Sequence, residues 1–245
     1  MVIKGRRQVT EQEYIENYRR FDHLTEDLWN DTIRPDYSAD VWYNKNRNQI
    51  VRAMIGDKFR GLRVLAEGTG TGSAQWADNE VLDGLGASEV IKSNLIAGEG
   101  VDVACDACNL PFENESFDAI FCRELIEHVL NDDLLLSEAR RVLRPNGWLL
   151  ITTPNGLHWL PDGFFHIRAY SPKQFIDKLN SYHFEAIEKR GNMPNVLRTL
   201  LPVIRTCSRR AILEEFKNLE GIWNKIEDSY YFGGELYVLC QKVTP

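Results

Sequence analysis

The sequence predicts a doubly wound α/β fold, in which a mostly parallel sheet of about seven strands carries helices on both faces. Short apolar segments alternate along the chain with segments of helical periodicity, and several of the strand-like segments are apolar on both faces. The stretch VLAEGTGTG, at 64–72, is an apolar strand that runs into alternating glycines and then into a helical segment. A chain of 245 residues with 43% apolar content can bury the core of one main domain.

Two helical segments precede the first strand, and the second of them spans about 40–55. Strands are expected at 62–67, 88–94, 100–106, 117–123, 147–154, 184–189 and 234–243. Helices are expected at 73–85, at 131–147 after an N-capping side chain, and at 171–180 after a Ser-Pro start. The span between the second and third strands is too short for a helix, so a loop is expected there. We expect a helical cap at 1–58, a core domain at 59–190, and a second helical cap with the last strand at 191–245.

Composition excludes several classes of partner. The net charge is −7, with 29 basic residues scattered among 36 acidic ones, so the chain lacks the positive field that holds nucleic acid. The N-terminal stretch has no apolar core of a signal peptide, and no apolar run approaches the length that spans a bilayer. We therefore expect a cytoplasmic protein that binds no nucleic acid and does not span a membrane. Its oligomeric state does not follow from the sequence.

The cysteines give little reason to expect a metal site or a disulfide. Cys105 and Cys108 have the spacing of a metal knuckle or a redox pair, but Cys122, Cys207 and Cys240 are isolated. A zinc site would need two more ligands at knuckle spacing. We expect five reduced thiols and no bound metal.

Four stretches together carry a family resemblance: VLAEGTGTG, CDACNLPFENESFDAIFCRELIEHV, EARRVLRPNGWLLITTPN and HIRAYSPKQF. In order and spacing they resemble the class I S-adenosylmethionine-dependent methyltransferases over roughly residues 60–190, particularly the branch that acts on small molecules and glycans. The resemblance implies a Rossmann-like methyltransferase sheet and S-adenosylmethionine as methyl donor, with S-adenosylhomocysteine as product. The expected acceptor is a sugar, a nucleotide-linked sugar or a natural-product intermediate, methylated on oxygen or nitrogen.

The resemblance assigns cofactor contacts to the ends of four strands. The glycine turn should admit the methionine part of the cofactor, and Asp106 should accept a hydrogen bond from the adenine amino group. The full expected set is Glu67, Gly68, Thr69, Gly70, Thr71, Gly72, Asn94, Leu95, Asp106, Ala107, Cys108, Cys122, Arg123 and His128. Glu124 follows Cys122 and Arg123 after the fourth strand, where the family lines the space around the transferred methyl. Two simpler roles remain open, since Asp106 could only cap its own turn and Arg123 could only form a surface ion pair.

The sequence departs from the family pattern at two positions. The family usually has an acid at the position of Ala66, whereas here the acid comes one residue later, at Glu67, and successive strand side chains point to opposite faces. Either the strand ends early and Glu67 turns into the site, which we favour, or that support is lost. At the end of the second strand Asn94 replaces an acid that commonly binds the ribose, so the cofactor affinity should be modest.

The acceptor site is expected beyond the fifth strand. His158 is the candidate general base, although a structural role is open for each histidine. Substrate contacts are expected from aromatic residues and one further histidine: Tyr18, Trp42, Trp159, His166 and Tyr170. For the Arg-rich stretch 195–216 we favour a solvated helical cap over contact with an anionic substrate, a membrane surface or a partner.

Two other classes of function remain. The two departures would also suit a protein that keeps this fold for binding, regulation or chemistry other than methylation. A nicotinamide-dependent oxidoreductase is disfavoured because Asn94 replaces the acid that would bind the ribose, and no Tyr/Lys pair follows.

Overall fold

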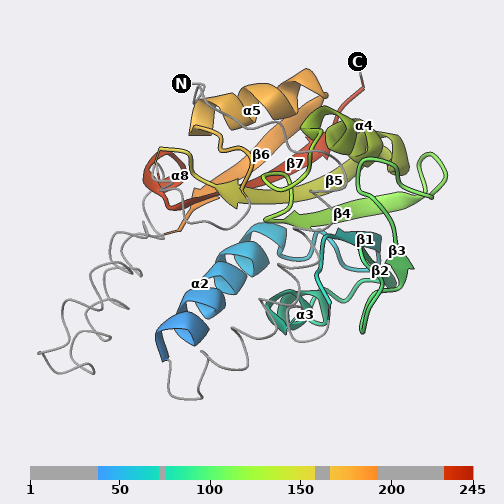
Figure 1. Cartoon of the computed structure of the whole chain (residues 1–245), viewed down its shortest axis with the longest axis horizontal. Coiled ribbons are helices and arrows are strands. Elements are labelled where there is room, and N and C mark those ends of the chain that lie inside the picture. Colours follow the sequence, from blue (N-terminus) through green and yellow to red (C-terminus); the bar gives the residue numbers. More distant parts are fainter. Residues whose placement is uncertain (1–37, 72–75, 158–165, 193–228, 245) are drawn as a thin grey trace, which may run out of the picture.

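The computed structural model describes residues 38–71, 76–157, 166–192 and 229–244. Seven strands form one sheet in the order β3-β2-β1-β4-β5-β7-β6 (Figure 1). The strands are β1 Arg63–Glu67, β2 Glu89–Asn94, β3 Val103–Ala104, β4 Phe117–Arg123, β5 Leu143–Pro154, β6 Phe184–Gly191 and β7 Glu235–Lys242. Only β7 runs antiparallel to its neighbours, β5 and β6. The predicted doubly wound, mostly parallel sheet of seven strands is therefore confirmed.

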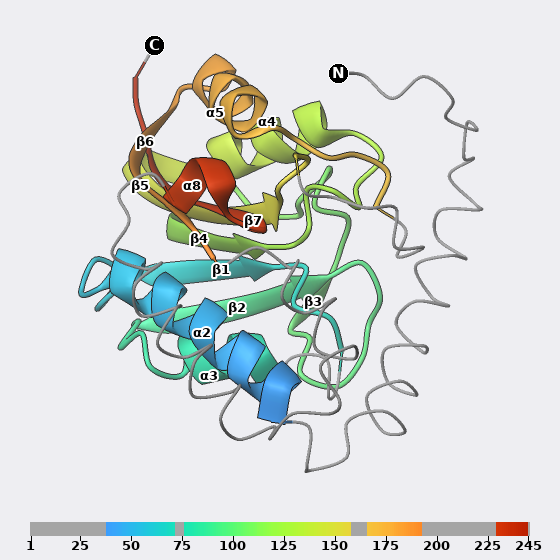
Figure 2. The same ribbon diagram turned by 90° about the vertical axis from the view of Figure 1, so that its left-hand side faces the viewer.

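Helices cover both faces of this sheet, as Figure 2 shows. Helices α2 (Ser38–Ile55) and α3 (Trp76–Leu82) lie on one face, and α4 (Asp132–Val142) and α5 (Pro172–Ser181) lie on the other. The short helix α8 (Ser229–Phe232) directly precedes β7. No helix occurs between β2 and β3 in the described chain, so the expected loop is confirmed.

Two expected strands have different lengths in the structure. β3 comprises only Val103–Ala104, much less than the predicted 100–106. β5 starts at Leu143 rather than at residue 147, because Leu143 already pairs with Phe117 of β4 before the register shifts. The predicted helix end at 147 is accordingly wrong, and α4 ends at Val142.

Local sequence explains where α4 and α5 begin. The Asn131 side chain caps α4 by accepting hydrogen bonds from the N–H groups of Asp133 and Leu134, both at 3.1 Å. Ser171 and Gln174 form a reciprocal capping box at the start of α5, and Pro172 occupies its first turn.

The two faces of the sheet bury separate apolar clusters because strand side chains alternate. Val64 and Ala66 belong to the cluster under α2 and α3, whereas Leu65 belongs to the cluster under α4 and α5. The side chains that form the candidate site lie where these two layers end, at the carboxyl edge of β1, β4 and β5. Because β7 is antiparallel, its first residue, Glu235, pairs with Pro154 at this same edge.

β7 comes from the C-terminal segment but lies between β5 and β6. The division at residues 58 and 190 stays a prediction. In the residues that the structure describes, no helix has the length and apolar character needed to cross a bilayer.

Candidate functional site

The glycine turn begins directly after β1. Gly68 and Gly70 have φ values of +67° and +70°, a conformation that side chains other than glycine rarely adopt. The N–H groups of Gly68 and Thr69 both donate to the Ser93 carbonyl of β2, at 2.9 and 3.3 Å. This anchors the turn to the neighbouring strand. Gly72 lies outside the described residues.

Glu67 remains inside the strand. It pairs with Ser93 of β2 and Cys122 of β4, so the expectation that β1 ends early is wrong. The backbone stays extended through residue 67, and Glu67 therefore faces away from Ala66. Both carboxyl oxygens are buried beside the Cys122 thiol, a weak donor, and accept no ordinary hydrogen bond from the described residues. Burial raises the pKa of this carboxyl to about 8, so the neutral acid predominates near neutral pH.

The expected adenosine contacts lie at the ends of β2 and β3. Asn94, the last residue of β2, is buried and donates to the Ile96 carbonyl at 3.1 Å, while Leu95 follows it. The Asp106 carboxylate accepts from the Cys108 N–H at 2.8 Å. Asp106 thus has the turn-capping role that the sequence left open, and Ala107 lies inside this turn. Adenine recognition by these residues stays a prediction.

Cysteine chemistry is weak at this edge. Cys105, Cys108, Cys122 and Cys240 are free thiols. Burial raises the pKa of Cys105 to about 11 and that of Cys108 to about 12. Because the thiolate is the reactive form, neither residue of the CDAC pair is poised for redox chemistry at neutral pH.

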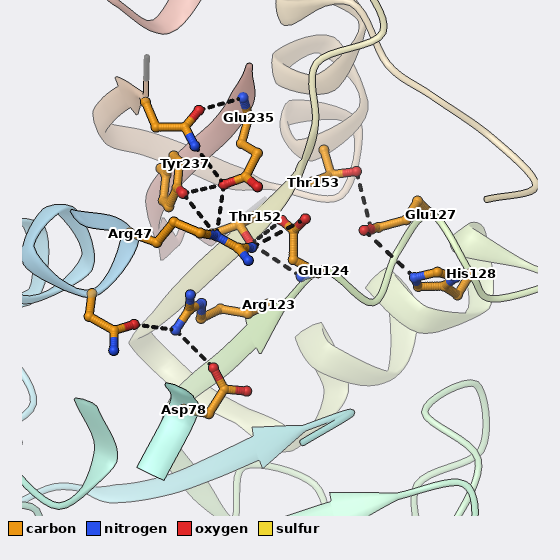
Figure 3. Close-up of polar contacts among 12 residues, drawn as sticks. Arg47, Asp78, Arg123, Glu124, Glu127, His128, Thr152, Thr153, Glu235 and Tyr237 are labelled. Atoms are coloured by element: carbon orange, nitrogen blue, oxygen red, sulfur yellow. Dashed lines mark hydrogen bonds and ion pairs between the residues drawn. The ribbon is translucent and has the colours of Figure 1, made fainter. Parts of the chain in front are cut away.

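Arg123, at the end of β4, forms a buried ion pair rather than the surface pair that was left open. Its side chain is 3% exposed, and Nη1 donates to Asp78 of α3 at 2.8 Å and to Asn48 of α2 at 3.0 Å (Figure 3). The Arg123 Nε–H is buried and has no hydrogen-bond partner in the part of the chain that the structure describes. One side chain therefore connects the sheet to both helices of this face.

A second polar cluster surrounds Arg47 of α2 (Figure 3). The guanidinium lies 3.3 Å from the Glu124 carboxylate and 2.9 Å from the Glu235 carboxylate. Tyr237 donates its hydroxyl to Glu235, and the Thr152 hydroxyl donates to Glu124 at 2.7 Å. Side chains from α2, β5 and β7 thus meet around Glu124, the residue that follows β4.

Glu124 is the accessible acid of this cluster. Its side chain is 25% exposed, against 7% for Glu235. Its φ is +48°, and its N–H donates to Thr152 Oγ1 at 3.1 Å. Burial and then the nearby Glu235 raise the pKa of Glu124 to about 7, although Arg47 and Thr152 lower it. A carboxyl group with this pKa can exchange a proton near neutral pH.

The third group of polar side chains contains Glu127, His128 and His166. Glu127 is fully buried, and its carboxylate accepts from the Thr153 hydroxyl at 3.2 Å. His128 Nε2 lies 3.9 Å from Glu127, and the His128 and His166 rings have centroids 4.8 Å apart. The possible ligand atoms of the three residues lie within 4.8 Å of one another, a spacing at which they could share a metal ion. The absence of a bound metal stays a prediction.

The other expected substrate contacts are less informative. Tyr170 is buried against Phe175 and donates its hydroxyl to Asp132, which fits a packing role. Tyr18, His158 and Trp159 lie outside the described residues, and the Trp42 side chain on α2 is also outside them. Their expected roles stay predictions.

The sequence analysis placed Glu124 near the transferred methyl but not as a base, and it missed the other acids and their partners: Arg47, Asp78, Glu127, Thr152, Thr153, Glu235 and Tyr237. One signal could have found part of this set. Polar residues that directly follow apolar strand residues, such as Thr152 and Thr153 in β5, mark the carboxyl edge of a parallel sheet, where ligands bind.

Comparison with known proteins decides the family. The sequence profile described as "Methyltransferase domain" matches residues 68–151, from the glycine turn into β5. The chain belongs to the class I S-adenosylmethionine-dependent methyltransferases. This methyltransferase uses S-adenosylmethionine as its methyl donor.

Relatives of this methyltransferase are distant. It is 26% identical over 220 residues to a ubiquinone biosynthesis O-methyltransferase of Agrobacterium fabrum, covering 73% of this chain and 85% of the relative. It is 27% identical to a probable S-adenosylmethionine-dependent methyltransferase of Mycolicibacterium smegmatis, over 61% of this chain and 62% of that one. Among solved structures, the 1,6-didemethyltoxoflavin-N1-methyltransferase of Burkholderia thailandensis has a TM-score of 0.59 at 16% identity, covering 98% of this chain and 93% of the other.

The residues present fit the cofactor. Two buried polar atoms beside the turn, Thr69 Oγ1 and Arg123 Nε, have no hydrogen-bond partner among the described residues. Buried polar atoms are usually satisfied, so unsatisfied ones at a ligand-binding edge indicate that a bound molecule completes them.

Proposed function

We propose that this methyltransferase transfers a methyl group from S-adenosylmethionine to a hydroxyl or amino group of a small molecule, and that Glu124 accepts the proton. Bound S-adenosylmethionine supplies an electrophilic methyl group on a sulfonium. The glycine turn, with Thr69 and Thr71, holds the methionine part, and Asn94, Leu95 and the turn at Asp106, Ala107 and Cys108 hold the adenosine. Cys122 and His128 would line the space around the transferred methyl.

The position and protonation of Glu124 carry the assignment of the base. Glu124 follows the end of β4 at the edge where the glycine turn starts, and it is more exposed than the neighbouring Glu235. With a pKa of about 7, a large share of Glu124 is ionised at neutral pH and can take a proton. The Glu124 carboxylate would take the proton that the acceptor's O–H or N–H group loses when the cofactor's methyl group is transferred to it.

The names of two relatives indicate a chemical class for the methyl acceptor. They refer to a ubiquinone intermediate methylated on oxygen and a didemethyltoxoflavin methylated on nitrogen. We therefore favour an aromatic or heteroaromatic natural-product intermediate over the sugar and nucleotide-sugar acceptors that the sequence also suggested.

An acceptor screen with methyl-labelled S-adenosylmethionine tests this proposal. The panel contains a catechol, a heteroaromatic N–H compound and a nucleotide-linked sugar, and mass spectrometry identifies each product. We expect labelled product from the catechol or the heteroaromatic compound. Transfer to the sugar alone would contradict the acceptor class, and failure to bind S-adenosylhomocysteine in calorimetry would contradict the methyltransferase function itself.

A further inference from the structure

We infer that the buried pair Arg123 and Asp78 holds the amino-acid end of the cofactor, with Asp78 accepting from its ammonium group and Arg123 Nε–H donating to its carboxylate. This inference rests on the proposed function, because it assumes that S-adenosylmethionine binds at the glycine turn. It assigns to Asp78, a residue of α3, a role that the sequence gave to the end of β1.

The sheet register brings Arg123 next to the glycine turn. Glu67 of β1 pairs with Cys122 of β4, so the next residues along the two parallel strands are Gly68 and Arg123. Ala66 pairs with Phe121, and both belong to the apolar cluster under α2 and α3. Because side chains alternate, Arg123 lies on this same face, one step beyond the cluster. The described cluster on this face provides no carboxylate from β1, since Ala66 stands there and Glu67 faces the other way.

Asp78 brings a carboxylate to this place from the helix. It lies near the start of α3, the helix that follows the glycine turn in the chain, and its Oδ1 atom accepts from Arg123. The Asp78 side chain is 18% exposed, whereas that of Arg123 is 3% exposed. The pair therefore presents its acidic member to the surface and its basic member to the interior.

The unsatisfied donor indicates an anionic acceptor. A buried guanidinium normally uses its N–H groups, yet Arg123 Nε has no partner although Nη1 has two. An α-amino acid carries an ammonium and a carboxylate on one carbon, so an adjacent carboxylate and guanidinium N–H match both charges. Both hydrogen bonds would be charge-assisted and therefore strong.

A network around Asn48 fixes this geometry. Asn48 is fully buried, accepts from Arg123 at 3.0 Å, and donates to Glu80 of α3 at 2.9 Å. The two acids of α3 thus have different partners, Asp78 on Arg123 and Glu80 on Asn48. Asp83, an exposed acid directly after α3, provides the control, because Asp83→Asn removes a nearby carboxylate that is not part of this network.

Calorimetry with truncated ligands separates recognition from folding. S-adenosylhomocysteine carries the amino-acid end, and methylthioadenosine lacks it. We expect Asp78→Asn to weaken S-adenosylhomocysteine binding about tenfold to a hundredfold, as the loss of a charge-assisted hydrogen bond implies, and to leave methylthioadenosine binding unchanged. The control variant Asp83→Asn should change neither affinity. Equal weakening of both ligands by Asp78→Asn, or no weakening, would overturn the inference.

Decarboxylated S-adenosylmethionine tests the Arg123 contact. The wild-type protein should bind it more weakly than S-adenosylmethionine, and Arg123→Gln should remove most of that preference. A preference that survives in Arg123→Gln would overturn the carboxylate contact. If the wild-type protein binds methylthioadenosine as tightly as S-adenosylhomocysteine, the inference fails while the proposed function stands. Binding of neither ligand would count against both.

Discussion

The Arg47 guanidinium of α2 lies 2.9 Å from the Glu235 carboxylate at the start of β7, and both side chains are largely buried. The same guanidinium lies 3.3 Å from Glu124. One cation therefore balances two acids at the carboxyl edge of the sheet. Removing it would leave both carboxylates without their positive partner in a poorly solvated place.

Replacing Arg47 should destabilise the protein strongly. We expect Arg47→Met to lower the free energy of unfolding by about 3 kcal/mol, the usual cost of leaving a buried charge unpaired. Urea denaturation measures it. Arg60→Met is the control, because Arg60 and its partner Asp57 have side chains 75% and 88% exposed, and exposed pairs contribute less than about 1 kcal/mol. If the two variants lose a similar free energy of unfolding, the buried Arg47 ion pairs stabilise the protein no more than an exposed pair does.

The rate of methyl transfer should depend on the ionisation of Glu124. A base acts only when ionised, so the rate constant should rise with pH and level off above about pH 7. Glu124→Gln should slow transfer to an acceptor found in the screen by about a hundredfold or more and abolish this rise, while S-adenosylhomocysteine affinity stays the same. Thr152→Val removes a hydrogen bond that lowers the pKa of Glu124, and should move the midpoint to higher pH. An unchanged midpoint would argue that another group titrates.

The glycine turn can be tested against a second glycine of similar backbone. A Cβ at Gly68 would lie 2.8 Å from Leu125 Cδ1, whereas a Cβ at Gly61 would meet nothing within 4 Å. Their φ values are +67° and +72°, so both alanine variants carry comparable backbone strain of about 1 kcal/mol or more. We expect Gly68→Ala to weaken S-adenosylhomocysteine binding about tenfold or more in calorimetry, and Gly61→Ala to leave it unchanged. If both variants bind S-adenosylhomocysteine equally well, the Leu125 side chain moves aside without displacing the glycine turn.

Stability should fall as the pH rises because of Glu67. Its pKa is about 8 in the folded protein, against about 4.3 for an unperturbed glutamate. Between these values the folded state holds a proton that the unfolded state has lost, so the stabilisation present at low pH is lost progressively up to about pH 8. Thermal unfolding between about pH 5 and pH 9 should show Glu67→Gln gaining on the wild type as the pH rises. The exposed Glu185→Gln control should keep a constant difference from the wild type. If the melting temperature of Glu67→Gln also differs from that of the wild type by a constant amount, the pKa of Glu67 is that of an ordinary glutamate.

Local patterns made much of the fold predictable. The alternation of strands and helices, the N-caps at Asn131 and Ser171, and the glycine turn each depend on residues close together in the sequence. The two-residue period of β1 also correctly places Ala66 and Glu67 on opposite faces. What it could not show is that pairing with Ser93 and Cys122 keeps Glu67 inside the strand.

The acidic part of the candidate site could not be predicted from local sequence. Arg47, Glu124 and Glu235 come from a helix, the residue after β4 and the first residue of β7, and only the sheet order brings them together. The sequence led us to look for a base among histidines beyond β5. The raised pKa of Glu124 depends on burial and on Glu235, neither of which a local pattern shows.

The place of β7 has a consequence for synthesis on the ribosome. β5 and β6 are translated well before β7, yet neither pairs with the other, and each uses β7 as its neighbour. A nascent chain that has not yet released Glu235–Lys242 therefore exposes two unpaired strand edges, which are prone to aggregation. The Arg47 ion pair with Glu235 also cannot form until that point, so emergence of the last strand completes both the sheet and the acid cluster at its edge.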